Sequence, residues 1–248
     1  MCVPFGKLLR GKVIPNTVTK TLHTDKVYEP DLKSYKIEPF PFYSPLDSQI
    51  KMIKSFERPV ILVDDLVHKA DRLQALAPSL REAEIPIKKV VVGVISGYGR
   101  DLMQSFHLPV EAIYSMPNLR QWFVESTLYP FIGGDTVRRD EFEVAGLQPS
   151  VNMILPYATP KLSGCSREAL YEFSVCCIES SRDLFRLLES EYRKQFAKNL
   201  TLSRLSEAVI LPLIPDKGSC MDYDENLAAS VYLENDLEML GRMKEFMI

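Results

Sequence analysis

The stretch from Val60 to Arg72 constrains the fold more than any other part of the sequence. It reads Val-Ile-Leu-Val-Asp-Asp-Leu-Val-His-Lys-Ala-Asp-Arg, four apolar residues followed by two adjacent acidic ones. A continuous apolar run of this kind is typical of a strand buried on both faces of a parallel sheet. We therefore expect a buried strand that ends at Asp64 and Asp65, then a short loop, then a helix that begins near Ala70 or Asp71.

The same alternation of strand and helix continues along the chain. Residues 70–84 have helical spacing of leucines, and Val90 to Ile95 reads as a second buried strand. Residues 100–106 read as a short helix, and residues 112–114 as a third strand. Strand, helix and strand joined by brief connections predict a parallel βαβ arrangement. The expected fold class is α/β, with a parallel sheet flanked by helices.

The regions on either side have a different texture. Residues 13–22 and 35–40 read as extended strands, and the polar, turn-rich residues 23–31 between them read as an exposed loop. Residues 45–56 have the spacing of a helix with Ser44 as its cap. We expect these residues, with the βαβ region, to form an α/β domain over residues 1–150.

Residues 151–248 read as mostly helical, and we expect them to pack on the α/β domain as a C-terminal layer. Ser166 can cap a long helix that runs to about Ala197, because serine oxygens accept the free amides of a first helical turn. The apolar side of this helix would carry Leu170, Phe173, Cys177, Leu184, Leu187 and Leu188.

Composition excludes several classes of function. Thirty basic residues against 33 acidic ones give a net charge of −3, which argues against a nucleic-acid surface. No stretch approaches the roughly 20 apolar residues of a membrane span, and the first residues lack the basic-then-apolar order of a signal peptide. Five irregularly spaced cysteines without a CxxC pair argue against zinc or disulfides. These features predict a cytoplasmic protein with free thiols.

The acidic pair suggests a class of ligand. In open α/β sheets, ligands bind outside the carboxyl ends of the strands, and the amides of a helix N-terminus suit a phosphate. Asp64 and Asp65 are poor phosphate ligands, but they are good acceptors for ribose hydroxyls, directly or through Mg²⁺. The pattern therefore favours a clamp for ribose 5-phosphate.

This segment resembles the phosphoribosyl-pyrophosphate signature of type I phosphoribosyltransferases. That signature has four apolar residues, two acidic residues, two apolar residues and a small or hydroxyl-rich phosphate loop. Residues 60–67 fit it, Ala70 is tolerated at a position where glycine is usual, and Arg72 fits the last position. His68 and Lys69 depart from the small residues expected there. The resemblance covers residues 13–135, and only residues 60–72 carry the specific motif.

The resemblance implies a phosphoribosyltransferase-like sheet and a set of roles. Asp64 and Asp65 would bind ribose hydroxyls and Mg²⁺. No protein ligand to the metal is expected beyond these two residues. The 5′-phosphate would be held by His68, Lys69, Ala70, Asp71 and Arg72. Lys20 or His23 would belong to a mobile lid, and Trp122 or Phe123 would stack on a base. The implied partner is phosphoribosyl pyrophosphate or a nucleotide, the implied enzyme class is a glycosyltransferase, and the chain would form a homodimer or follow upstream domains.

Two departures from the family pattern argue against catalysis, while ligand binding would remain possible. Lys69 is bulky at a point where the backbone must approach a phosphate closely, and too few residues precede residue 13 for the family's pyrophosphate loop unless residues 6–11 replace it. Residues 122–134 are also similar to C-terminal regions of large bacterial proteins described as cytidylyltransferase-related. These features leave three alternatives: a degenerate phosphoribosyltransferase, a non-catalytic nucleotide-sensing or structural module of a larger multidomain bacterial protein, and a phosphoreceiver-like domain.

A structural explanation stands beside these functional ones. Asp64 and Asp65 would then be solvated acids that cap the following helix. His68, next to them, would be an ordinary hydrogen-bonded loop histidine.

Overall fold

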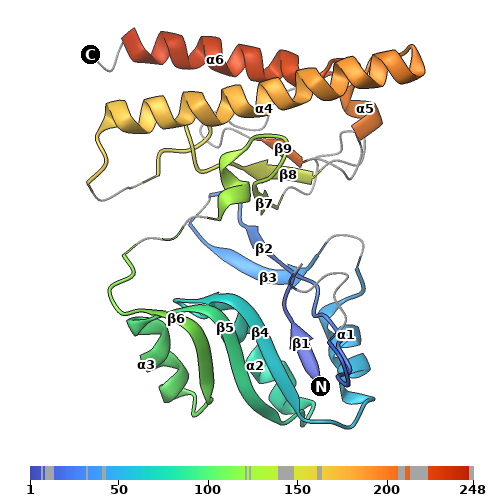
Figure 1. Cartoon of the computed structure of the whole chain (residues 1–248), viewed down its shortest axis with the longest axis vertical. Coiled ribbons are helices and arrows are strands. Elements are labelled where there is room, and N and C mark those ends of the chain that lie inside the picture. Colours follow the sequence, from blue (N-terminus) through green and yellow to red (C-terminus); the bar gives the residue numbers. More distant parts are fainter. Residues whose placement is uncertain are drawn as a thin grey trace. The chain divides into compact units, whose positions relative to one another are not determined.

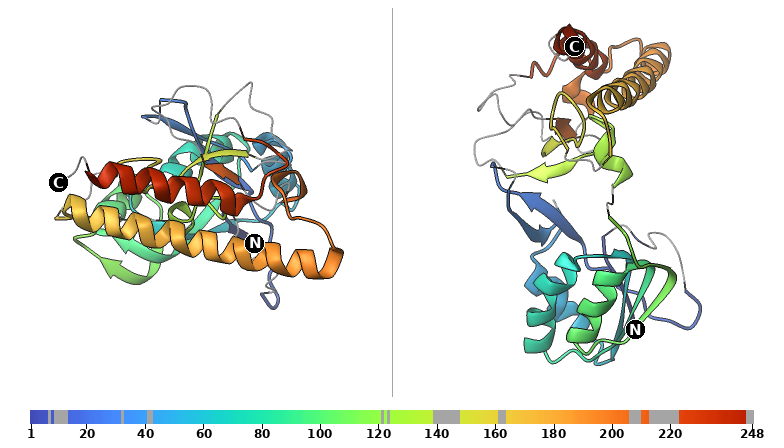
Figure 2. Two further views of the ribbon diagram at one scale, coloured as in Figure 1. Left: turned by 90° about the horizontal axis from the view of Figure 1, so that it is seen from above. Right: turned by 90° about the vertical axis from the view of Figure 1, so that its left-hand side faces the viewer.

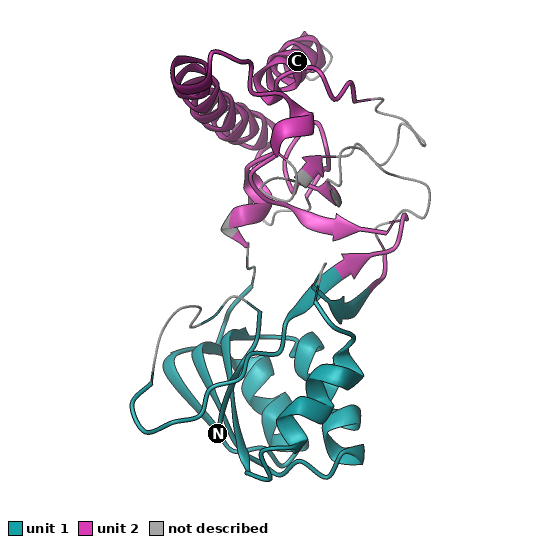
Figure 3. Cartoon of the chain, turned by 90° about the vertical axis from the view of Figure 1, so that its right-hand side faces the viewer, with its two compact units in different colours: residues 1–26, 36–122 teal, residues 27–35, 123–248 magenta. Residues whose placement is uncertain are grey.

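The computed structural model contains two compact units, which are described separately (Figures 1 and 3). It describes residues 1–6, 8, 14–31, 33–40, 43–120, 122, 124–138, 148–160, 164–205, 210–212 and 223–245. Unit 1 consists of Met1–Lys26 and Lys36–Trp122, and unit 2 of Val27–Tyr35 and Phe123–Ile248. The compact units divide after residue 122 and within the strands β2 (Thr24–Tyr28) and β3 (Tyr35–Pro39), and the domain boundary predicted at residue 150 stays a prediction.

Unit 1 is built on a four-stranded parallel sheet with the strand order β1-β4-β5-β6. Its strands and helices are β1 (Cys2–Pro4), α1 (Leu46–Lys54), β4 (Val60–Val67), α2 (Asp71–Glu82), β5 (Ile87–Ser96), α3 (Gly97–Ser105) and β6 (Val110–Met116). The expected βαβ succession is therefore confirmed, with a parallel sheet and flanking helices. The three helices lie on one face of the sheet (Figure 2, right), as right-handed crossovers between strands that advance in one direction require.

The core of unit 1 lies between the sheet and these helices. Alternate residues of β4 and β5, such as Leu62 and Val92, point into it and meet Ile53 of α1, Leu76 of α2 and Met103 of α3. The opposite face of β4 is only half buried at Ile61 and Val63. The prediction of a strand buried on both faces thus holds for one face.

The N-terminal part of the chain differs from the sequence prediction. The residues predicted as an exposed loop contain a strand, β2 (Thr24–Tyr28), in which Thr24 and Val27 are buried. The described residues of the predicted 13–22 strand make only isolated parallel bridges, at Thr19 and Leu22. The prediction failed because β2 pairs with β7 (Asp135–Val137), which lies far along the chain, and because polar residues such as Asp25 and Lys26 obscure the alternation typical of a strand. The predicted 35–40 strand is confirmed as β3 (Tyr35–Pro39).

Unit 2 joins a mixed sheet to long helices. The second sheet has the order β3-β2-β7-β8-β9, and the division between the units falls within β2 and β3. The elements after residue 122 are η1 (Glu125–Leu128), β7 (Asp135–Val137), β8 (Gln148–Val151), α4 (Arg167–Phe196), α5 (Leu202–Leu205), β9 (Ile210–Pro212) and α6 (Ala229–Glu245). Helices α4 and α6 run side by side (Figures 1 and 2).

Helix α4 begins as predicted, with the Ser166 side chain accepting a hydrogen bond from the amide of Ala169. Its buried face is rotated from the expected one, because Phe173, Leu184, Leu187 and Leu188 are exposed. The helix instead buries Leu170, Ser174, Cys177, Ile178, Ser181 and Phe185. Serines on the buried face allow close approach of neighbouring backbone, which a search for leucines overlooks. Within the described residues, no helix has the length and apolarity to cross a membrane.

Candidate functional site

Asp64 and Asp65 lie inside strand β4 and not beyond its end. The strand continues through Leu66 and Val67, which pair with Val94 and Ile95 of β5. Because these two apolar residues after the acidic pair continue the hydrogen-bonded ladder with β5, the strand ends at Val67 and not at Asp65 as predicted. The other neighbour, β1, stops opposite Val63. The two carboxylates are therefore carried on the side of β4 that β1 leaves uncovered.

A pocket of about 290 Å³ lies at this position. It brings together both predicted ribose-binding acids, one predicted phosphate-binding residue and the residues that follow β1: its lining is Phe5, Gly6, Leu8, Asp64, Asp65 and Arg72. Gly6 and Leu8 belong to residues 6–11, the possible replacement for the pyrophosphate loop. Phe5 had no signal in the sequence, because only the pairing of β1 with β4 brings it here.

Asp64 and Arg72 form an ion pair in the wall of this pocket. Arg72 Nη1 donates to Asp64 Oδ1 at 2.7 Å, and the exposed fractions of the two side chains are 10% for Asp64 and 30% for Arg72. The guanidinium carbon also lies 5.7 Å from the centre of the Phe5 ring. Burial raises the pKa of Asp64 to about 7, although the Arg72 charge opposes the rise. The Asp64 carboxyl therefore titrates near neutral pH, and Arg72 already contacts Asp64 before any ligand binds.

Asp65 is the accessible carboxylate of the pair. Its side chain is exposed, and its Oδ1 accepts a hydrogen bond from the neighbouring amide of Leu66, at 2.8 Å. The main chain at this point is packed closely against β5: a Cβ on Gly93 would lie 2.9 Å from the Asp65 carbonyl oxygen. The strand therefore fixes Asp65 firmly while leaving its carboxylate open to the pocket, which suits a hydrogen-bond acceptor for a ligand hydroxyl.

The predicted phosphate segment is only partly gathered at the pocket. Arg72 lines it, whereas His68, Lys69, Ala70 and Asp71 do not. His68 Nδ1 is 2.8 Å from Ser96 Oγ, which also caps α3 by accepting the amide of Gly99. The left-handed backbone of Ala70, with φ of 54°, starts α2 without a side-chain cap. The amides of the first turn are thus available to an anion, although the Asp71 carboxylate in that turn competes for the same positive end of the helix.

The described main-chain amides in the expected pyrophosphate loop, and the one just before it, already donate hydrogen bonds within the chain. Phe5 N–H donates to Val63, Gly6 N–H donates to Leu22, and Leu8 N–H donates to Phe5. Gly6 adopts a φ of 60°, a conformation that favours glycine. The other residues of the predicted loop at residues 6–11, namely 7 and 9–11, lie outside the described residues. The three described amides serve the fold of unit 1.

The described residues predicted for the lid and for base stacking, Lys20, His23 and Trp122, do not line the pocket. The Lys20 side chain is exposed, and the His23 ring stacks on Tyr43 with 3.8 Å between ring centres. His23 N–H donates to the Gln49 side chain, which ties this part of the chain to α1. Trp122 is exposed, and Phe123 lies outside the described residues.

Among the described residues that line the pocket, Asp64 and Asp65 are the carboxylates that could contact a magnesium ion. Nowhere in the described parts of the chain do three or more His, Cys, Asp or Glu side chains gather as metal ligands. Asp64 is held by Arg72, which leaves the Asp65 carboxylate as one ligand. Since Mg²⁺ demands octahedral oxygen coordination and commonly takes several ligands from substrate phosphates, the ion could bind here only together with the phosphate oxygens of a ligand.

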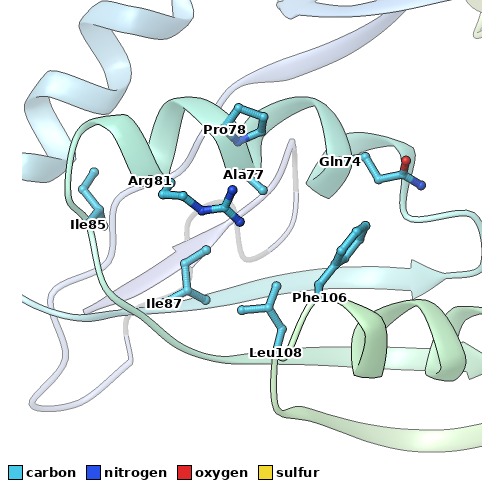
Figure 4. A pocket seen from close by; sticks show the side chains of 8 residues that line it. All are labelled: Gln74, Ala77, Pro78, Arg81, Ile85, Ile87, Phe106 and Leu108. Carbon is cyan, nitrogen blue, oxygen red and sulfur yellow. The ribbon is translucent and has the colours of Figure 1, made fainter.

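A second pocket of about 380 Å³ lies near the amino ends of β5 and β6 (Figure 4). One wall is α2, from which the Arg81 guanidinium extends over the cavity, and Gln74 stands at one end (Figure 4). The lining is Gln74, Ala77, Pro78, Arg81, Ile85, Ile87, Phe106 and Leu108. It shares no residue with the Asp64 pocket, and it contains none of the side chains that the sequence singled out as site residues.

The geometry thus brings Asp64, Asp65 and Arg72 together, and the other predicted site residues that the structure describes do not line this pocket. Comparison with protein-family models and with curated proteins finds no match for this chain.

Proposed function

We propose that unit 1 binds a phosphoribosyl group or a nucleotide in the Asp64 pocket and does not transfer it. The observation that carries this proposal is the pocket itself, where an exposed carboxylate on a rigid strand lies beside a guanidinium from the first turn of α2. Asp65 would accept ribose hydroxyls, and Arg72 with the uncapped start of α2 would face the 5′-phosphate.

The proposal favours binding over catalysis for an electrostatic reason. Transfer of a phosphoribosyl group proceeds through a cationic ribosyl centre while pyrophosphate leaves, so the leaving group needs fixed positive charge or free amides. Around the pocket, the described amides of Phe5, Gly6 and Leu8 already donate within the chain, and Arg72 Nη1 donates to Asp64. A nucleotide-sensing module needs affinity alone. An active glycosyltransferase would need those groups free.

The decisive experiment titrates the full chain with phosphoribosyl pyrophosphate, ribose 5-phosphate and nucleoside monophosphates, with and without Mg²⁺, by calorimetry. We expect binding that Asp65→Asn weakens by about tenfold or more, the effect of losing a hydrogen bond to a charged group. Asp101→Asn, which removes an exposed carboxylate from α3, is the charge-matched control and should bind as the wild type does.

Two results would overturn the proposal. The first is no heat or saturation with any of these ligands at millimolar concentration, which would favour a purely structural module. The second is binding that Asp65→Asn leaves unchanged, which would put the ligand elsewhere. Release of pyrophosphate on addition of a nucleobase would replace the binding function with an enzymatic one.

The phosphoreceiver alternative gains no support from the arrangement of the sheet. Such a domain needs a phosphoacceptor aspartate at the end of the strand beside the acidic pair. In this chain that strand is β5, and it ends at Ser96, whose hydroxyl is engaged by His68 and by the first turn of α3.

A further inference from the structure

Strand β6 forms an open edge of the sheet in unit 1. The opposite edge, β1, is covered by the bridges of Cys2 with Thr19 and of Phe5 with Leu22. Along β6, by contrast, no strand or bridge of the described chain pairs with the outer side. An uncovered edge presents a row of main-chain donors and acceptors that can template another strand.

The register of β6 identifies which main-chain groups are unused. Val90 N–H donates to the carbonyl of Pro109, and the parallel pairing continues from Val90 with Val110 to Ser96 with Met116. In such a ladder, alternate residues bond to one neighbour. Odd-numbered residues of β6 therefore bond to β5, while the N–H and C=O groups of Val110, Ala112 and Tyr114 point away from it.

The side chains of β6 lack the usual protection of an edge. Ile113 is 74% exposed, Tyr114 67% and Met116 47%. The strand contains no lysine and no internal proline, the devices by which edge strands avoid association. Its one charged residue, Glu111, is held by Lys89 at 2.6 Å. Large apolar side chains are thus exposed beside unused hydrogen-bonding groups.

We propose that β6 pairs antiparallel with β6 of a second copy of the chain, so that the two sheets join across a twofold axis at Ile113. In this register, outward-pointing residues face one another: Ala112 lies opposite the partner's Tyr114, and Val110 opposite the partner's Met116. A large side chain meets a small one in the first pair, and an aliphatic contact forms in the second. A twofold axis makes every such contact occur twice.

Charge also favours a second copy in this register. Glu111 falls opposite the partner's Ser115 and not opposite the partner's Glu111, so no like charges meet directly. Ser115 Oγ accepts a hydrogen bond from the Arg100 guanidinium at 3.2 Å. In the dimer, each Glu111 therefore lies near the Arg100 guanidinium of the other copy. The strand is complementary to itself in hydrogen bonding, side-chain size and charge.

The test is the association of the full chain in solution, followed by sedimentation velocity over about 1 to several hundred µM. We expect the weight-average mass to rise towards that of two chains, because a short strand interface gives a reversible dimer. Ala112→Pro removes one outward N–H and no bond to β5, a substitution that edge strands tolerate. Ile113→Lys puts a charge on the axis. Each should raise the dissociation constant about tenfold or more.

The matched control is Ile132→Lys, which adds the same charge at an exposed apolar position of unit 2 and should leave the dimer unchanged. Amide hydrogen exchange supplies an independent measurement. The amides of Ala112 and Tyr114 should become protected as the concentration rises, while the amide of Ile113, already bonded to β5, should not change.

A mass that stays at one chain throughout the range would overturn the proposal, and so would a dimer that Ile113→Lys leaves intact. Should Ala112→Pro fail to fold, the lysine variant and the alternating exchange pattern still decide the question.

Discussion

Replacing Asp64 with asparagine should change how the stability of unit 1 depends on pH. In the folded chain, burial raises the pKa of Asp64 from 3.8 to about 7. A raised pKa means that the folded state holds the proton more tightly than the unfolded state does. The stabilisation is therefore complete below the unfolded pKa and is lost as the pH rises through the folded one.

The size of the effect follows from the shift. Each pKa unit corresponds to about 1.36 kcal/mol, so titration of this one group from about pH 5.5 to about pH 8 should lower the free energy of unfolding by about 2 kcal/mol. The asparagine variant has no such titration, and its new side chain has nearly the shape of a protonated aspartate. The variant should match the wild type near about pH 5.5 and exceed it by about 2 kcal/mol near about pH 8.

The assay is amide hydrogen exchange of β4 and β5, which reports the opening of unit 1 separately from that of unit 2. A carboxyl ¹³C titration gives the pKa of Asp64 directly. Identical pH dependence in the two proteins, or a measured pKa below the ordinary value of 3.8, would show that the 2.7 Å contact with Arg72 outweighs burial and would refute the reasoning. Arg72→Gln should move the pKa of Asp64 further upward, because it removes the charge that opposes the rise.

Three further substitutions test the packing of the two units by denaturant unfolding. Gly99→Ala places a Cβ too close to the main-chain carbonyl oxygen of Val67 in β4 and should destabilise unit 1 by about 1–3 kcal/mol, whereas Gly241→Ala, with open space around it, should be neutral or stabilising. Equal effects of the two would contradict the close approach. Ser166→Ala should cost about 1 kcal/mol through loss of the α4 cap, with Ser180→Ala on the same helix as a near-neutral control. Leu62→Ala, at a fully buried position of β4, should cost about 2–5 kcal/mol, and a loss under about 1 kcal/mol would argue against the assigned core.

Local sequence patterns were sufficient for the central part of unit 1. The apolar runs predicted β4 and β5, the spacing of Leu73, Leu76 and Leu80 predicted α2, and the serine before α4 predicted its start. Each of these signals is contained within a few residues, because strand alternation and helical periodicity are properties of neighbouring side chains. They predicted the α/β class with its parallel sheet and placed the acidic pair at the end of the strand that is β4.

The candidate site required more than its local motif. The motif predicted Asp64 and Asp65 at a strand tip with the phosphate segment wrapped around it. The ladder with β5 extended the strand past both acids, and the early end of β1 opened the pocket on the flank of β4. Arg72, expected to bind phosphate, pairs with Asp64. The side-chain pattern of residues 60–72 contains no information about where the neighbouring strand β1 ends.

The sequence by itself determined which segments are strands and helices in residues 60–116 and that two carboxylates lie among them. The tertiary structure decided that β2 is a strand, that the chain divides into two units near residue 122, and that Phe5 and Gly6 line the same pocket as Asp64. The physical reason is that strand pairing satisfies main-chain donors and acceptors between distant segments. A side-chain pattern shows that a strand needs a partner, and only the folded chain shows which partner it finds.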